Sequence, residues 1–396
     1  MKRQSLQMIP AERMKVLPTQ FFAKLSTKVA ERISQGYDVI NLGQGNPDQP
    51  TPEHIVEAMQ KATANSKYHG YSPFQGHRFL KEAIAEYYAR EYQVELNPDT
   101  EVAILFGGKS GLIEVSQCLL NPGDVCLVPD PGYPDYWSGI SLAEAKMEFM
   151  PLREENQFLP DYEQIPPAIL AQAKMMFLNY PNNPTAGVAT SSFFKKTVDL
   201  AYDHQIAVVH DFAYGAIGFD GEKPLSFLQT PGAKEVGIEI YTLSKTYNMA
   251  GWRVGFAVGN PQIVRLLNLI QDHQFVSLFG AIQEASAIAL TSSQQCVSDL
   301  VALYQRRRDH LFKELDLLGW RAQKPKGSFF SWLPVPEGYT SESFATLLFD
   351  QAQIAVAPGI GFGEQGDRYL RVGLLTSEAR ISEAAERMKK LGIFHT

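Results

Sequence analysis

The chain reads Tyr241-Thr-Leu-Ser-Lys245-Thr-Tyr-Asn-Met-Ala-Gly-Trp-Arg253-Val-Gly255 at the end of an apolar strand predicted over residues 238–243, and this stretch decides the fold. A lysine at the end of a buried strand is uncommon, because burial disfavours its charge. An ion pair would explain it, and so would a covalent role as a Schiff-base amine. Thr242, Ser244 and Arg253 add two hydroxyls and a cation around one loop, as a phosphate monoester would need.

Short apolar runs alternate with helical patterns on both sides of this stretch. Strands are predicted at residues 102–106, 125–129, 175–178, 207–209, 238–243 and 254–258, and helices between them at 111–120, 191–204 and 261–272. Several strands are apolar at every position, which is typical of a parallel sheet covered on both faces. The alternation predicts a doubly wound α/β domain with ligand groups at the carboxyl ends of its strands.

The last hundred residues have a different pattern. A long amphipathic helix is predicted at 295–318, followed by strands at 329–333, 354–357 and 369–374 and helices at 341–351 and 377–391. A helix at 20–35, stopped by Gly36, is expected to join them. We therefore predict a large domain over residues 45–285 and a smaller α+β domain formed by residues 1–44 and 286–396.

Polar side chains follow two more strands. Asn183 lies in the stretch Asn-Tyr-Pro-Asn-Asn-Pro-Thr at 179–185, and Asp211 is followed three residues later by Tyr214. The carboxylate could keep a pyridine nitrogen protonated, while the phenol and the amide could hydrogen-bond a ring oxygen. A turn at Asn183 and a helix N-cap at Asp211 are the simpler interpretations. Arg371, on a predicted strand, could hold a carboxylate with both arms of its guanidinium, and a surface ion pair is the alternative.

Several well-known motifs are matched only in part, or lack the neighbouring helix or strand that their function needs. Residues 361–366 match GxGxxG, but a strand follows where a dinucleotide site needs a helix. Gly108-Lys109-Ser110 imitates the end of a phosphate loop whose first glycine would fall at Ala103, inside a strand. No HExxH occurs, the histidines lack zinc-ligand spacing, and Ser110 is not in a GxSxG elbow. No metal site is expected.

Composition narrows the class of protein further. The chain has 396 residues, 45% hydrophobic and 20% charged, with a net charge of −7. That sign disfavours a general nucleic-acid or anionic-membrane partner. No secretory signal or membrane-length apolar run is present. Cys118, Cys126 and Cys296 are scattered in apolar stretches, as expected of reduced thiols in the cytoplasm.

Over nearly its whole length the chain resembles the fold-type I pyridoxal-phosphate (PLP) aminotransferases of class I and II, the aspartate aminotransferase family. The most specific match is the string Ser-Lys-x-x-x-x-Ala-Gly-x-Arg-x-Gly at 244–255. The resemblance implies a large, mostly parallel seven-stranded sheet, PLP as cofactor, and a homodimer. It also implies ping-pong transfer of an amino group between an amino acid and a 2-oxo acid.

The resemblance further implies a role for each matching residue. Lys245 would form the Schiff base, Asp211 would pair with the pyridine nitrogen, and Asn183 and Tyr214 would contact the phenolate oxygen. The other cofactor contacts implied are the phosphate loop at Gly108 and Lys109, Thr242, Ser244 and Arg253 beside it, Tyr133 stacked on the ring, and Tyr71, reaching the cofactor phosphate of the neighbouring subunit. Gly43, Asn183 and Arg371 would hold the substrate.

Two departures from the family pattern stand out. The common Asn-Pro-Thr-Gly reads Asn183-Pro-Thr-Ala186-Gly187 here, which should matter little unless φ at Ala186 is positive. Lys109 stands where some members carry a hydroxyl residue, which leaves the role of its side chain open.

The sequence also bears on the identity of the substrate. Stretches such as PDPGYPDYWSG and HDFAYGA resemble those of bacillus-type methionine-salvage aminotransferases, which implies 4-methylthio-2-oxobutanoate as acceptor and methionine as product. Aromatic residues at Phe21, Phe22, Tyr68 and 275–280 would suit a neutral substrate, although core packing explains them equally well. Other neutral, aromatic or acidic amino acids stay open, as do a PLP-dependent C–S β-lyase, a cyclopropane-forming synthase and a non-catalytic sensor.

Overall fold

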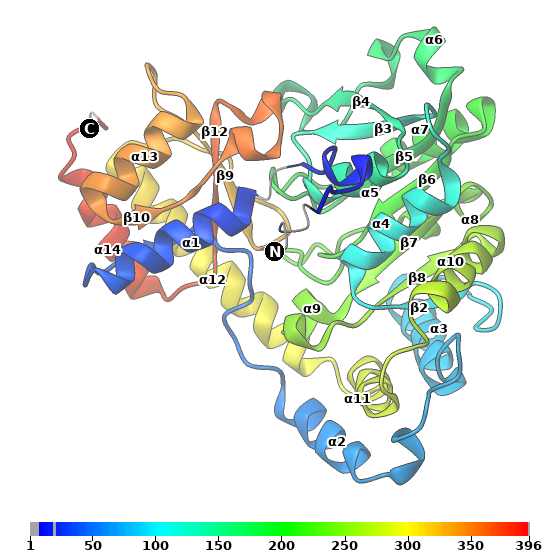
Figure 1. Cartoon of the computed structure of the whole chain (residues 1–396). Coiled ribbons are helices and arrows are strands. Elements are labelled where there is room, and N and C mark those ends of the chain that lie inside the picture. The colour runs from blue at the N-terminus through cyan, green and yellow to red at the C-terminus, as the bar shows by residue number, and fades with distance from the viewer. Residues whose placement is uncertain (1–7, 19–20, 395–396) are drawn as a thin grey trace, which may run out of the picture.

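The computed structural model describes residues 8–18 and 21–394, and these residues form three sheets (Figure 1). The largest has the strand order β2-β8-β7-β6-β5-β3-β4, a second has the order β11-β12-β9, and β1 pairs with β10. The strands are β1 (Ile40–Asn41), β2 (Val102–Leu105), β3 (Val125–Asp130), β4 (Lys146–Pro151), β5 (Ala173–Asn179), β6 (Ala207–Asp211), β7 (Gly237–Thr242), β8 (Gly255–Gly259), β9 (Phe330–Pro334), β10 (Ile354–Ala355), β11 (Ala357–Pro358) and β12 (Tyr369–Gly373).

Helices cover these sheets. They are α1 (Phe21–Ser34), α2 (Glu53–Thr63), α3 (Arg78–Tyr92), α4 (Gly108–Leu119), α5 (Asp135–Leu142), α6 (Pro167–Leu170), α7 (Ser191–His204), α8 (Ala233–Val236), α9 (Leu243–Thr246), α10 (Pro261–Gln274), α11 (Gly280–Thr291), α12 (Gln295–Leu318), α13 (Ser341–Ala352) and α14 (Glu378–Lys389). Of the predicted helix 20–35, Gln20 lies outside the described residues. The rest forms α1, and Gly36 has the positive φ of +89° expected after a helix end.

The seven-stranded sheet is mostly parallel, as predicted. Strands β4, β3, β5, β6 and β7 pair in parallel, whereas β8 runs antiparallel to both β7 and β2. The run 254–258 is apolar throughout, and an apolar run carries no information about strand direction. The edge strand β4 was not predicted, because its residues are largely exposed or half-buried.

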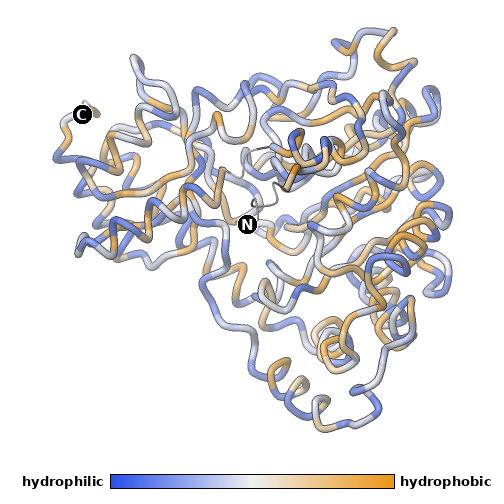
Figure 2. The backbone as a smooth tube through the Cα atoms, viewed as in Figure 1, coloured by the Kyte–Doolittle hydropathy of each residue, from blue (hydrophilic) through white to orange (hydrophobic). Residues whose placement is uncertain are grey.

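Successive residues of each inner strand pack into two different cores. On β5, Met176 and Leu178 join the core built with α3 and α7, while Met175 and Phe177 join the core built with α4 and α5. The inner strands are therefore buried on both faces, and their carboxyl ends are left free to carry the site. Figure 2 shows the hydrophobic residues gathered along these strands and along one side of the surrounding helices.

The two smaller sheets combine both ends of the chain. Ile40 of β1 pairs with Ile354 of β10, and the predicted strand 354–357 is divided at Val356 between two sheets. Tyr214 packs into the same core as β9, β12 and α12, although it lies within the predicted large domain. The domain boundaries therefore stay a prediction. Within the described ranges, no helix is both long and apolar enough to cross a membrane.

Candidate active site

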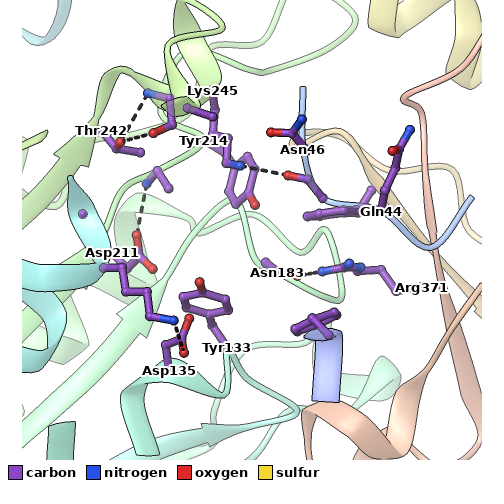
Figure 3. Close-up of a pocket in the computed structure, with 18 of the residues that line it drawn as sticks. Gln44, Asn46, Tyr133, Asp135, Asn183, Asp211, Tyr214, Thr242, Lys245 and Arg371 are labelled. Atoms are coloured by element: carbon purple, nitrogen blue, oxygen red, sulfur yellow. Dashed lines mark hydrogen bonds and ion pairs between the residues drawn. The ribbon is translucent and has the colours of Figure 1, made fainter. Parts of the chain in front are cut away.

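A cavity of about 530 Å³ lies at the carboxyl ends of β5, β6 and β7, and its wall is completed by α1, the segment 41–46, β9 and β12. That volume is typical of a small-molecule site. Every residue predicted for the site lines it except Tyr71, namely Gly43, Gly108, Lys109, Tyr133, Asn183, Asp211, Tyr214, Thr242, Ser244, Lys245, Arg253 and Arg371. Figure 3 shows Asp211 and Arg371 on opposite sides of the space, with Tyr214 and Lys245 between them.

Lys245 lies on the single turn α9, directly after β7. Thr242 caps this turn, since its hydroxyl accepts the N–H of Ser244 at 3.2 Å. The ammonium of Lys245 donates to the carbonyl oxygen of Gly45 at 2.9 Å. Burial, followed by the nearby charges of Arg371 and Arg253, lowers the pKa of Lys245 to about 8. With a pKa of about 8, roughly a fifth of this amine is neutral at pH 7.4, far more than for an ordinary lysine, and the neutral form is the one that a nucleophile or a base requires.

Asp211 is the last residue of β6, and its side chain is buried. It accepts the hydroxyl proton of Tyr136 at 2.7 Å and the N–H of Ala213 at 3.3 Å. Burial raises the pKa of Asp211 to about 6, although the Tyr136 hydrogen bond acts in the opposite direction. A cationic N–H placed in the cavity would relieve the cost of this buried charge.

An anion-binding end is formed by the first turn of α4. Gly107 occupies the N-cap position without a side-chain cap, so the first N–H groups of the helix are available to a ligand. We predicted that this helix would begin at residue 111, but it begins at Gly108, which places Gly108 and Lys109 in its first turn. Thr242, Ser244 and Arg253 line the cavity beside them. The Lys109 ammonium pairs with Asp135 at 2.9 Å.

Arg371 of β12 is fully enclosed. Its two terminal nitrogens donate to the Asn183 side-chain oxygen at 2.9 Å and to the Gly43 carbonyl oxygen at 3.0 Å, while its buried Nε has no partner in the described part of the chain. Phe330, Phe22 and Phe362 surround the guanidinium, with ring centroids 4.0, 4.8 and 4.8 Å away. Burial lowers the pKa of Arg371 to about 10. The cation is thus held ready for an anionic ligand.

The structure adds detail on two residues that the sequence analysis singled out, Gly43 and Ala186. Gly43 uses both backbone groups internally, because its N–H donates to the Asn41 side chain at 3.1 Å and its oxygen accepts from Arg371. It therefore orients Arg371. Ala186, which stands where the common family pattern has glycine, has a φ of +58°. A positive φ strains alanine but not glycine, so the exchange does matter here.

Sequence reasoning missed several residues of the wall. Gly45, Asn46, Asp135 and Phe330 all line the cavity. Gly45 and Asn46 come four and five residues after the end of β1, so the strand-end pattern could have pointed to this segment had the two-residue strand been predicted. Phe330 falls inside a predicted strand, where no signal separates a wall residue from a core residue. Of the aromatic candidates, Phe22 lines the cavity, whereas Phe21, Tyr68 and residues 275–280 do not.

These groups fit one kind of ligand. The uncapped start of α4 and Arg253 suit a phosphate, buried Asp211 suits a protonated ring nitrogen, and Arg371 with its free Nε suits a carboxylate. Tyr133, which Figure 3 shows beside Asp135 and near Asp211, offers an aromatic ring to the same cavity. A phosphorylated heteroaromatic cofactor together with an α-carboxylate substrate satisfies all three.

The chain belongs to the class I and II aminotransferases, whose family model matches residues 37–388. Members of this family use pyridoxal phosphate, and the chain is a PLP-dependent aminotransferase. It is 63% identical, over 96% of both chains, to the L-glutamine--4-(methylsulfanyl)-2-oxobutanoate aminotransferase of Bacillus subtilis. The solved structure of substrate-bound BacF from Bacillus subtilis superposes with a TM-score of 0.95 at 47% identity, covering 99% of this chain and 100% of the other. A Thermus thermophilus aspartate aminotransferase double mutant gives 0.90 at 29% identity, covering 97% and 100%.

Proposed function

We propose that this aminotransferase moves the amino group of glutamine to 4-(methylsulfanyl)-2-oxobutanoate and so forms methionine in methionine salvage. The observation that carries the proposal is the 63% identity over 96% of both chains to an enzyme named for these two substrates. The reaction has two half-reactions at one site, so each substrate must occupy the same cavity in turn.

The charges of the cavity support a neutral substrate side chain. Among the described residues that line it, the cations are Lys109, Lys245, Arg253 and Arg371. Lys109 pairs with Asp135, and the other three have the roles proposed below. A second substrate carboxylate would therefore be desolvated without a cation of its own. Phe22 offers apolar surface to a thioether, and Asn46 offers an amide that could bond the carboxamide of glutamine.

We assign the following roles to this chain's residues. When bound, PLP supplies an electron-withdrawing ring that stabilises negative charge at the substrate Cα. The start of α4, Thr242, Ser244 and Arg253 would hold its phosphate, Tyr133 would offer its ring for stacking, and Asn183 and Tyr214 would donate hydrogen bonds to its ring oxygen. Asp211 keeps a proton on its ring nitrogen.

Lys245 and Arg371 act on the substrate side of the cavity. Lys245 would hold the cofactor, and its free neutral amine would move a proton from the substrate Cα to the cofactor's C4′ carbon in one half-reaction and in the opposite direction in the other. Arg371 fixes the α-carboxylate with both arms, so that the Cα–H bond meets the Lys245 amine in one orientation. The enclosed walls around Arg371 exclude water from that ion pair.

Borohydride reduction of the purified holoenzyme tests the central assignment. We expect peptide mapping to find the reduced cofactor on Lys245, because this lysine lines the cavity and burial lowers its pKa. Lys109 is the internal control, since it lines the same cavity but pairs with Asp135. An adduct on Lys109, or none, would refute the assignment.

Steady-state rates with one donor test the substrate. We expect 4-(methylsulfanyl)-2-oxobutanoate to exceed oxaloacetate by over a hundredfold in kcat/KM, since an unpaired buried carboxylate costs about 3 kcal/mol or more. Comparable activity on oxaloacetate would mean that an additional cation reaches the cavity.

Incubation with an amino acid alone distinguishes transamination from a β-lyase reaction. Transamination releases one 2-oxo acid per site, whereas a β-lyase continues and releases ammonia and thiol.

We propose that the enzyme is a cytoplasmic homodimer. All three cysteines are free, as expected in a reducing compartment. Tyr71 is 93% exposed and Phe74 is 63% exposed, so this loop offers two large rings to a second copy of the chain. If Tyr71 completes the neighbour's site, mixing inactive Lys245→Ala and Tyr71→Ala chains should restore about a quarter of wild-type activity, because about half the dimers are mixed and each has one intact site. A fully active monomer in sedimentation would refute the proposal.

A further inference from the structure

The glycine-rich string 361–366, which is not a dinucleotide loop, forms two short turns directly before β12. They are η7 (Gly359–Phe362) and η8 (Glu364–Gly366). Each glycine permits a close approach. A Cβ at Gly361 would lie 2.8 Å from the ring of Phe21, and one at Gly363 would lie 2.0 Å from a carboxylate oxygen of Asp130. The string therefore joins segments that are far apart in the sequence.

Asp130 is the central contact of this junction. It is the last residue of β3, and its buried side chain accepts the N–H of Gln365 at 3.2 Å. In the opposite direction, the N–H of Gly132 donates to the carbonyl oxygen of Phe362 at 2.9 Å. No ion pair of the described residues involves Asp130, so backbone N–H groups alone hold its carboxylate. Burial raises the pKa of Asp130 to about 6.

The junction connects two parts of the active site. Tyr133 of the cavity wall lies three residues after Asp130. On the other side, the fully buried ring of Phe362 lies 5.3 Å from the ring of Phe22 and 4.8 Å from the Arg371 guanidinium. Phe362 is therefore one wall of the aromatic enclosure around Arg371, and its backbone is fixed to the Tyr133 segment.

We propose that Asp130 is a positioning residue for substrate binding, which acts by anchoring loop 361–366 and thereby Phe362 against Arg371. The proposal rests on the role of Arg371 proposed above. The fork of Arg371 is held by only two oxygens and by ring faces, so a shifted Phe362 changes the direction in which the guanidinium meets a carboxylate. Orientation errors of this kind weaken binding steeply.

The test measures carboxylate binding separately from turnover. The probe is 4-(methylsulfanyl)butanoate, which has the carboxylate and side chain of the substrate but neither an amino nor an oxo group. We expect Asp130→Ala to raise its Kd on the holoenzyme, and the KM of both substrates, about tenfold, since hydrogen bonds to charged groups contribute on that order. We expect kcat to stay within about twofold. Asp130→Asn, which keeps an acceptor oxygen, should fall between.

Asp367→Ala is the matched control. Asp367 directly follows η8 and accepts from Ser341 at 2.9 Å, but among the described residues it forms no hydrogen bond or ion pair with Phe362, so probe affinity should not change. If Asp130→Ala does not fold, Phe362→Leu tests the same proposal, because it keeps an apolar side chain at this position but removes the ring. Probe affinity should then fall several-fold.

Two outcomes separate the proposals. An unchanged Kd in Asp130→Ala with a lower unfolding temperature, or an unchanged Kd in Phe362→Leu, would overturn the positioning role. An unchanged Kd in Arg371→Lys would instead refute the role of Arg371 in substrate binding.

Discussion

Replacing Asp211 by asparagine should stabilise the cofactor-free protein while weakening its hold on PLP. The pKa of this buried carboxyl is raised from 3.8 to about 6, chiefly by burial. At about 1.4 kcal/mol per tenfold change in proton affinity, keeping it ionised at neutral pH costs about 3 kcal/mol. Asparagine removes the charge but cannot accept from both Tyr136 and Ala213, which costs about 1 kcal/mol. The expected net gain is about 2 kcal/mol at pH 7.5.

The sign of the pH dependence follows from the raised pKa. Between about pH 4 and 6 the folded protein binds the Asp211 proton more tightly than the unfolded chain, so wild-type stability falls as pH rises through this range. The advantage of Asp211→Asn should therefore be small or reversed at pH 4 and reach its full value above pH 6. Urea denaturation of both apoproteins at one protein concentration measures this difference.

Asp199→Asn is the control, because Asp199 is exposed and pairs with Lys195 on the surface of α7. The same loss of charge there should change the unfolding free energy by less than about 0.5 kcal/mol. The affinity of Asp211→Asn for PLP should fall, since the amide cannot offset a cationic ring nitrogen. An apoprotein that is less stable than wild type at pH 7.5, or a difference that does not vary with pH, would refute the reasoning.

Three further predictions concern other residues in and behind the wall of the cavity. Arg371→Lys should lower kcat/KM for every substrate by roughly ten- to a hundredfold, because an ammonium cannot replace both arms of the fork; steady-state kinetics decide. Tyr136→Phe keeps the stacking on Phe177 but loses the hydrogen bond to Asp211, which should raise the pKa of Asp211 further. The fall in apoprotein stability with rising pH should then end about one pH unit higher than in the wild type. An unchanged pH midpoint in the urea series would contradict this. In the apoprotein, Lys245 should react with trinitrobenzenesulfonate with a midpoint near pH 8, and a midpoint near that of ordinary lysines, about 10.4, would mean that burial does not shift its pKa.

The sequence was sufficient to predict that Asn183, Asp211 and Lys245 come together at one cavity. Asn183, Asp211 and Lys245 follow parallel strands, and parallel strands bring their carboxyl ends to one edge. No long-range information was needed beyond the strand pattern. The family resemblance added the roles of Gly108 and Tyr133, which local pattern does not carry.

The opposite wall could not be predicted in the same way. The enclosure of Arg371 uses Phe22, Phe330 and Phe362, which come from three parts of the chain and look like ordinary core residues in the sequence. Asp130 ends a strand as Asp211 does, but it points into a junction with loop 361–366. Which strand ends face a cavity depends on how distant segments pack, and periodicity contains no such information.

The pairing of β1 with β10 affects the order in which the chain can acquire its structure. Ile40 leaves the ribosome more than 300 residues before its partner Ile354 is made. At roughly 5–20 residues per second, this is a delay of about 15 to 60 s during synthesis. Throughout that interval the neighbouring apolar residue Leu42 lacks its final surroundings. Chaperones that protect nascent chains would therefore be needed by the segment around Ile40 and Leu42 long after it has been translated.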